Sequence, residues 1–322
     1  MIRYRADSGK GFTGCCPPAI CSVNRRAMMK NKKKAFGNTL LFITFLGPTL
    51  LTFACVLAIP FLYGVFLTFT NYDPIKGTKD FVGLANFAAV FSDKEFLGQF
   101  VKTLGYVLYS TIFCNLLAFL LAYLLTGNIR AQNFLRGGFF TPNLIGGIIL
   151  GYIWKFIFAN VVTQVGNALY FKPLMTSLLT HPDRAILAMT IVTVWQYAGY
   201  LMMIYIAGFV GIPRDVKEAA EIDGANGMKK LFNIIIPSMV PSFIICLFIT
   251  ISRGFMAYDL NLSLTNGAPY GATRLASMHI YQKAFQANQY ATGQAEAIVL
   301  FVAVAIAAVS QVLLMKKYEV EA

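Results

Sequence analysis

Residues Glu218 to Pro237 read EAAEIDGANGMKKLFNIIIP, a polar and charged stretch between two strongly apolar segments. Just before this stretch, Pro213 favours the start of a helix, because the missing proline N–H costs nothing in the first helical turn. The residues that follow are mostly good helix formers, until Gly224 and Gly227 interrupt them at a turn. A second short helix is predicted after Gly227, leading into the next apolar segment. The stretch therefore predicts a helix-turn-helix at a membrane surface.

The composition indicates a membrane protein. Of the 322 residues, 57% are hydrophobic and 13% are charged, whereas a soluble domain carries about 25% charged residues. The apolar residues come in long blocks, so the chain is predicted to form one membrane domain, residues 38–317. A basic N-terminal tail, residues 1–37, precedes this domain, and a short C-terminal tail, residues 318–322, follows it.

Six apolar runs predict six membrane helices, at about residues 39–70, 104–125, 138–158, 185–210, 234–253 and 297–315. Each supplies about 20 residues, the length that a hydrocarbon core of about 30 Å requires. An even number of spans places both termini on one side, and the basic residues gather in the segments of that side. These residues are Arg25, Arg26, Lys30, Lys32, Lys33, Lys34, Arg130, Arg136, Arg214, Lys217, Lys229, Lys230, Lys316 and Lys317.

Basic residues favour the cytoplasmic side of a membrane. The sequence thus predicts an all-α polytopic protein of the cell membrane, with six transmembrane helices, both termini in the cytoplasm and a cytoplasmic helix-turn-helix at 218–237. The formal net charge is +13. Because the basic residues flank the apolar runs, membrane lipids explain this charge better than nucleic acid does.

The cysteines divide into two groups. Cys55, Cys114 and Cys246 lie inside apolar runs and are predicted to be small buried hydrophobic residues. The other three lie in the N-terminal tail, where an unstructured extension is favoured over a metal site. No histidine or second cysteine pair at ligand spacing supports a metal there.

No catalytic constellation is present. The chain has no G-x-x-x-x-G-K-[ST] loop, so it does not bind ATP in the P-loop manner. Two histidines and few paired carboxylates argue against hydrolysis or metal chemistry. The sequence predicts a protein that is not an enzyme, has no cofactor or metal, and takes its energy from a partner.

The polar stretch resembles the signature cytoplasmic loop of binding-protein-dependent ABC importer permeases. That signature has EAA, three residues, G, and an apolar run that ends in P; here Asp223 and Ala225 also agree with it. The resemblance implies that the loop docks into a cleft on a separate cytoplasmic ATPase. It implies further partners: a second permease subunit, a paralogue in a heterodimer, and an extracytoplasmic solute-binding protein. The implied ATPase-coupling residues are Glu218, Ala219, Ala220, Asp223 and Gly224.

Two further segments are similar to the carbohydrate branch of this family, the maltose and multiple-sugar type. They are FVGLANF at 81–87 and LTNGAP at 264–269, the latter followed by IYQKAF at 280–285. The resemblance implies a subunit that forms half of the translocation pathway of a sugar importer in a bacterial cell membrane. The alternative is a permease of the same architecture for another solute, such as a polyol phosphate. An ion-driven carrier or a membrane enzyme is the alternative of a different class, and it lacks support because no carboxylate is placed within the spans.

The resemblance also implies substrate-pathway residues. Gln196, Tyr197 and Tyr200 fall on contact positions of maltose-type relatives by their spacing to Ile212-Pro213. Thr250, Arg253, Gly254 and Ala257 fall on such positions by their spacing to TNGAP. Relatives have asparagines where this chain has Gly254 and Ala257, which leaves open whether this subunit or its partner contacts the sugar. Arg253 is predicted either to bind substrate or to mark the outer interface. The implied pathway residues are Gln196, Tyr197, Tyr200, Thr250 and Arg253.

The start of the chain carries a separate hypothesis. Met28 and Met29, followed by KNKKK, form a natural start for this family. Residues 1–27 are therefore hypothesised to reflect a start codon assigned too early, which N-terminal sequencing of the purified protein tests.

Overall fold

The computed structural model describes residues 44–73, 77–127, 130–225 and 227–317. The two predicted tails and residues 1–27 therefore lie outside the described residues. The chain divides into two compact units, residues 1–64 and residues 65–322. The first unit contributes most of the helix Thr44–Leu67, which widens into the π-helical turn η1 (Ala54–Ala58) before α2 (Ile59–Leu67). Pro60 explains the widening, because it has no N–H to donate to the carbonyl of Val56.

Two strands open the second unit. They are β1 (Thr70–Asp73) and β2 (Thr78–Phe81), paired antiparallel with Thr70 opposite Phe81. The sequence did not predict this hairpin, although the fold is mostly helical as expected. The helices up to the polar stretch are α3 (Ala85–Ser92), α4 (Lys94–Leu125), α5 (Gln132–Phe140), α6 (Gly147–Phe156), α7 (Val162–Ala168) and α8 (Pro182–Gly211).

The remaining helices are α9 (Arg214–Ile222), α10 (Gly227–Lys230), α11 (Ile236–Ser238), α12 (Val240–Phe255), α13 (Asp259–Leu264), α14 (Ala276–Tyr281) and α15 (Tyr290–Lys316). Short 3-10 or π-helical turns join or extend several of them: η2 (Thr141–Leu144), η3 (Ile157–Val161), η4 (Lys172–Leu174), η5 (Leu178–Thr180), η6 (Leu231–Ile235) and η7 (Gln282–Gln286).

Five described helices are long and apolar enough to cross a membrane: Thr44–Leu67, Lys94–Leu125, Gly147–Ala168, Pro182–Gly211 and Tyr290–Lys316. A sixth candidate is the pair Gly227–Ser238 and Val240–Phe255, which is bent by 69°. The bend lies at Met239, between Pro237 and Pro241. Pro241 has no N–H for the carbonyl of Pro237, so the regular helix stops there.

The third predicted span, 138–158, is wrong in its position. The helix α5 ends at Phe140, η2 follows, and Gly146 has an extended backbone before α6 begins. The Thr141 hydroxyl donates to the carbonyl of Gly137, while Pro142 has no N–H for the carbonyl of Gly138. The candidate span starts only after this break, at Gly147.

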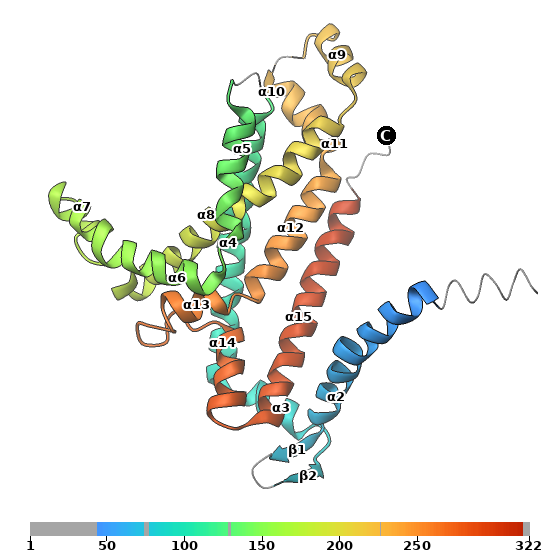
Figure 1. Ribbon diagram of the computed structural model, residues 1–322, viewed down its shortest axis with the longest axis vertical. Helices are drawn as coiled ribbons and strands as arrows, with labels where there is room; N and C mark the ends of the chain where they lie inside the picture. Colours follow the sequence, from blue (N-terminus) through green and yellow to red (C-terminus); the bar gives the residue numbers. More distant parts are fainter. Residues whose placement is uncertain (1–43, 74–76, 128–129, 226, 318–322) are drawn as a thin grey trace, which may run out of the picture. The chain divides into compact units, whose positions relative to one another are not determined.

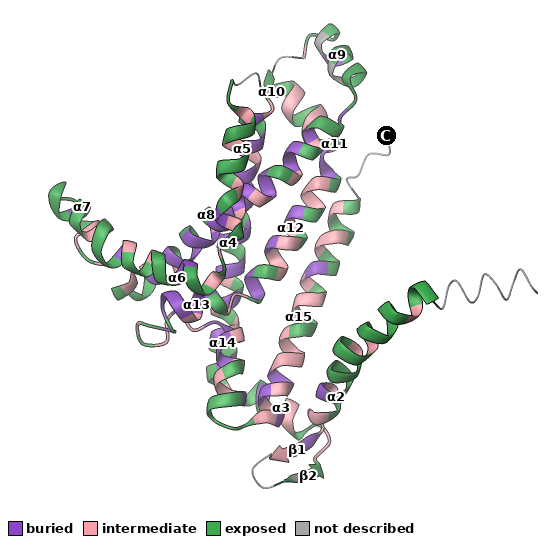
Figure 2. Cartoon of the chain, in the orientation of Figure 1, coloured by how far each residue is buried: buried purple, intermediate pink, exposed green. Residues whose placement is uncertain are grey.

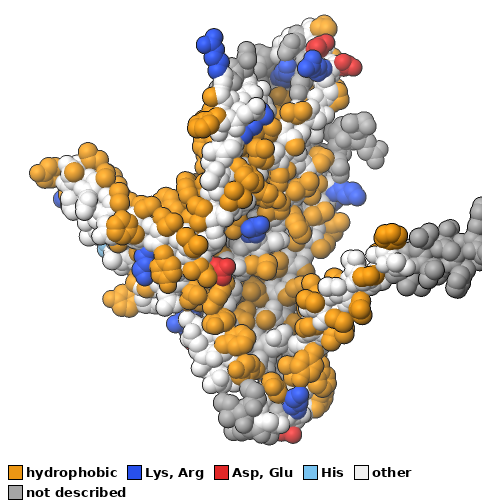
Figure 3. Space-filling model, in the orientation of Figure 1, with side chains coloured by type: hydrophobic (Ala, Val, Ile, Leu, Met, Phe, Trp, Pro, Cys, Tyr) orange, Lys and Arg blue, Asp and Glu red, His pale blue; other side chains and the backbone are white. Residues whose placement is uncertain are grey.

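The main core of the second unit lies where α4, α8 and α12 pack together (Figure 2). Buried aromatic and small side chains alternate there; Tyr205 and Phe209 of α8 pack on Phe119 of α4. Cys114 and Cys246 are buried as predicted, but Cys55 is exposed, because its helix buries no residue in its most apolar window. Hydrophobic side chains also cover much of the face that Figure 3 shows. Such a surface is expected for helices that contact the lipid of a bilayer.

Candidate functional site

The predicted helix-turn-helix is present at one end of the second unit. Both of its helices, α9 and α10, lie at this end, and α15 runs towards this end from the end that carries α3 (Figure 1). Of the predicted coupling residues in this stretch, Ala220 is buried at 5% exposure. The others, Glu218, Ala219, Asp223 and Gly224, are exposed.

Gly224 ends α9. Its φ is +73°, in the left-handed region that favours glycine. The N–H of Ala225 donates to the carbonyl of Ala220, and the N–H of Asp223 donates to that of Ala219. This is the pattern of a glycine C-cap, which satisfies carbonyls at the helix end and reverses the chain sharply. The turn between the two short helices is thus built by local hydrogen bonds.

The exposed face of this helix-turn-helix combines charge with apolar surface. Ile222 is 86% exposed, and Met228 is also exposed. Glu218 and Asp223 add carboxylates beside them. The exposed surface of this stretch thus includes both apolar side chains and carboxylates.

A second feature is a cavity of about 560 Å³ between α4, the break before α6, α8, and the α12–α13 connection. Three of the predicted pathway residues, Gln196, Tyr197 and Arg253, line it. The guanidinium of Arg253 lies 4.8 Å from the centre of the Tyr197 ring, and its Nη1 donates to the Tyr197 hydroxyl at 3.2 Å. Gln196 donates from Nε2 to the carbonyl of Ile145 at 2.9 Å.

The other two predicted pathway residues do not line this cavity. Thr250 is buried, where its hydroxyl accepts a hydrogen bond from Asn115 Nδ2 at 3.1 Å and donates to the carbonyl of Cys246. The ring of Tyr200 packs near Phe140 of α5. Thr250 therefore joins helices together, and Tyr200 belongs to the α5–α8 contact.

The cavity contains polar residues that the sequence did not single out as substrate contacts. Asn143, Tyr258 and Asp259 are among them. Burial raises the pKa of Tyr258 above its ordinary value, and Tyr281 and Asp259 raise it further. The Tyr258 phenol thus stays protonated near neutral pH. The signal that was missed is the Pro142 break, which brings Asn143 into the wall.

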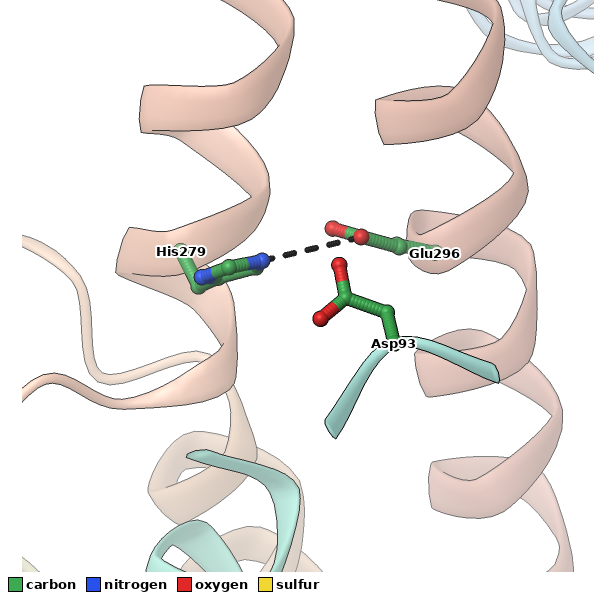
Figure 4. A group of neighbouring side chains, drawn as sticks. All are labelled: Asp93, His279 and Glu296. Carbon is green, nitrogen blue, oxygen red and sulfur yellow. Dashed lines mark ion pairs between the residues drawn. The ribbon is translucent and has the colours of Figure 1, made fainter. Parts of the chain in front are cut away.

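An ionic cluster lies near the end of the second unit that carries α3 and α14, opposite α9 (Figure 1; Figure 4). Asp93, His279 and Glu296 place ligand atoms within 4.8 Å of one another. The ammonium of Lys283 donates to Glu296 at 2.7 Å and also to Asp93. Glu296 is fully buried. Lys283 therefore supplies a cation that Asp93 and Glu296 share.

The pKa values of this cluster follow from its contacts. Burial alone would raise the pKa of Asp93, but hydrogen bonds from Lys283 and from the N–H groups of Phe96 and Glu95 lower it overall. Burial alone would lower the pKa of Lys283, but hydrogen bonds to Asp93 and Glu296 raise it overall. Both groups are therefore charged near neutral pH.

Comparison with known proteins identifies similar chains. Residues 82–320 match the family described as "Binding-protein-dependent transport system inner membrane component". A probable permease of a transport system for starch degradation products, from Thermoanaerobacterium thermosulfurigenes, is 41% identical over 91% of this chain and all of that protein. A multiple sugar-binding transport system permease of Streptococcus mutans is 31% identical over 85% of this chain and 96% of that protein.

A solved structure also shares the fold. It belongs to a bacterial ABC transporter involved in the import of the acidic polysaccharide alginate. Its matching chain has a TM-score of 0.76 at 19% identity and covers 89% of this chain and 99% of that one.

Proposed function

Because this chain belongs to the family of inner-membrane components of binding-protein-dependent transport systems, we propose that it forms half of the translocation pathway of an ATP-driven carbohydrate importer. The observation that carries the proposal is the cavity around Tyr197 and Arg253. It lies among the candidate spans and offers an aromatic face, hydroxyls and an amide. Sugars are bound by such aromatic contacts and by hydrogen bonds to their hydroxyls. The relatives named for starch degradation products and multiple sugars support this substrate class.

The helix-turn-helix at 218–237 is proposed to couple the pathway to a separate ATPase. A short helix closed by a glycine cap is rigid, so it passes on a displacement without absorbing it. The exposed Ile222, Glu218 and Asp223 supply an apolar and acidic surface for that contact. ATP hydrolysis belongs to the partner, since the chain has no phosphate-binding loop.

The remaining partners follow from the same assignment. We propose a paralogous permease as the other half of the pathway and an extracytoplasmic binding protein that delivers the solute. The chain resides in a bacterial cell membrane, with residues 38–317 as its membrane domain and both termini in the cytoplasm. The family description supports the binding protein, and the basic residues near α5, α9 and the end of α15 support the orientation.

A second candidate is a permease of the same architecture for a polyol phosphate. Arg253 favours it, because a guanidinium binds phosphate through paired N–H donors. Reconstitution with the partner permease, the ATPase and the binding protein separates the two. A sugar importer shows sugar-stimulated ATP hydrolysis, whereas stimulation by glycerol phosphate alone contradicts the carbohydrate proposal.

The coupling role is tested at Gly224. Valine at a φ of +73° is strained by about 1–2 kcal/mol or more, although a Cβ there meets no atom within 4 Å. Gly224→Val is expected to insert and assemble normally but to lose the ATP hydrolysis that sugar and binding protein stimulate. Gly227→Val is the matched control, because Gly227 also has free space and no positive φ. Normal stimulated hydrolysis in Gly224→Val contradicts the coupling role.

A further inference from the structure

The cavity wall holds one positive and one negative side chain. Among the described residues that line it, the charged ones are Arg253, near the end of α12, and Asp259, the first residue of α13. In the described part of the chain, no ion pair neutralises either of them. The cavity therefore offers a cation and an anion with a formal sum of zero.

Arg253 keeps donors for a solute. A guanidinium has five N–H groups, and the contact with the Tyr197 hydroxyl takes one of them. The ring of Tyr197 holds the guanidinium plane by a cation–π contact, so the remaining donors have a fixed direction.

Asp259 is held in place by its neighbours. The single O–H of Ser263 is shared between the Asp259 carbonyl at 2.8 Å and the Gly147 carbonyl at 3.2 Å, so it links α13 to α6. A Cβ on Gly147 would lie 3.0 Å from the Cβ of Asp259. The start of α13 thus packs tightly on the start of α6, which fixes the backbone of Asp259 beside the cavity.

These two charges treat solutes differently. A neutral polyhydroxylated solute can donate its hydroxyl protons to Asp259 and accept from Arg253, so both charges contribute hydrogen bonds. An anion gains from Arg253 but is repelled by Asp259, because like charges brought close together repel each other. We infer that Asp259 is a specificity-determining residue that excludes anionic solutes and restricts the cavity to neutral sugars or polyols. The inference rests on the proposed function, since it assigns the substrate class of the same cavity.

The test uses the assembled transporter in lipid nanodiscs and two oligosaccharides of equal length, neutral maltotriose and anionic trigalacturonate. Saturation-transfer NMR compares their binding without the binding protein. The wild type is expected to bind maltotriose and to bind trigalacturonate at least about tenfold more weakly. Asp259→Asn is expected to narrow that ratio to about threefold or less. Asp183→Asn is the matched control, because Asp183 is an exposed carboxylate that does not line the cavity.

Each outcome decides a different point. Equal binding of both oligosaccharides to the wild type, or an unchanged ratio in Asp259→Asn, overturns the charge selection and leaves the carbohydrate proposal standing. Binding of neither oligosaccharide to the wild type overturns the sugar-binding role of this cavity as well. A change of the ratio in Asp183→Asn equal to that in Asp259→Asn contradicts an effect of the cavity itself.

Discussion

At the scale of single residues, Asn115 links three helices inside the bundle. Its Oδ1 accepts from the hydroxyl of Tyr205 at 2.7 Å, and its Nδ2 donates to Thr250 at 3.1 Å and to the carbonyl of Thr111 at 2.8 Å. All four residues are buried. Hydrogen bonds between membrane helices average about 0.6 kcal/mol each, with a maximum near 1.7 kcal/mol. The network therefore fixes α12 against α4 and α8 at a moderate gain in stability.

A matched pair of substitutions measures that gain. Thr250→Val removes the acceptor of Asn115 and keeps the shape of the side chain, so it is expected to lower the free energy of unfolding by about 0.5–1.5 kcal/mol. Thr111→Val is the control, because the buried Thr111 hydroxyl has no hydrogen-bond partner in the described structure. Its removal is expected to be neutral or stabilising. Unfolding by increasing SDS in mixed micelles measures both, and equal losses would contradict the role of the network.

The sequence alone did not predict the close contact between α5 and α8 at Gly199. A Cβ on Gly199 would lie 1.7 Å from the carbonyl oxygen of Phe139, so α5 and α8 approach each other at a position that only glycine allows. The sequence shows Gly199 in an apolar run, but it does not show which helix lies against it. Such contacts depend on tertiary packing, which no local pattern contains.

At the scale of elements, hydrophobic patterning located the membrane helices well where the chain is regular. The runs at 185–210 and 297–315 fall within Pro182–Gly211 and Tyr290–Lys316. Patterning failed at the two proline breaks, near Pro142 and at Met239, because both lie inside continuous apolar sequence. Hydropathy measures burial in lipid and is insensitive to a lost backbone hydrogen bond. The cavity wall forms at the first of these breaks, so the site was partly hidden for the same reason.

The ionic cluster connects elements that are distant in sequence. Asp93 caps α4, Lys283 lies in η7, and Glu296 lies in α15. Removing one partner of such a buried pair leaves an uncompensated charge. Lys283→Met is therefore expected to lower the free energy of unfolding by about 2–4 kcal/mol at pH 7. Lys172→Met, at an exposed turn, is the control and is expected to change it by less than about 0.5 kcal/mol.

The sign of the pH dependence follows from the two pKa directions. Asp93 has a lowered pKa in the folded state, so its contribution is present above its unfolded pKa of about 3.9 and is lost as the pH falls through the folded value. Lys283 has a raised pKa, so its contribution is complete below its unfolded pKa of about 10.4 and is lost as the pH rises through the higher folded value. The difference in Tm between wild type and Lys283→Met is thus expected to shrink below pH 4. A difference that grows in acid would contradict the ion pair.

At the scale of the whole molecule, motifs and charge predicted the helical membrane fold and the family, but they did not predict the geometry of any site. The helix-turn-helix at 218–237 was predicted with its turn at Gly224, because its helix formers, its glycines and its family signature are all local. The cavity draws on residues from Tyr106 to Leu260, and the position of Asp259 within it depends on how α13 packs on α6. No spacing in the sequence reports that contact. Three of the five predicted pathway residues line this cavity, whereas Asp259 was not among the residues predicted.

The orientation of the chain in the membrane is the premise on which the coupling proposal depends. In the described part of the second unit, α9 and the end of α15 lie towards one end, and the connection after α7 lies away from that end (Figure 1). Basic residues gather in and near α9 and at the end of α15. Basic residues favour the cytoplasmic side. The 218–237 loop is therefore expected inside the cell, and the segment around Tyr170, which is 85% exposed, is expected outside.

Single cysteines in a background without the six native ones test this orientation. A membrane-impermeant maleimide added to intact cells is expected to label Tyr170→Cys and to leave Ile222→Cys unlabelled, since Ile222 is exposed on α9, at the end expected inside the cell. In inverted vesicles the Ile222 variant is expected to react, and bound ATPase subunits are expected to slow that reaction at least about threefold by covering α9. Labelling of Ile222→Cys from outside intact cells would remove the loop from reach of any cytoplasmic ATPase, and the coupling mechanism with it.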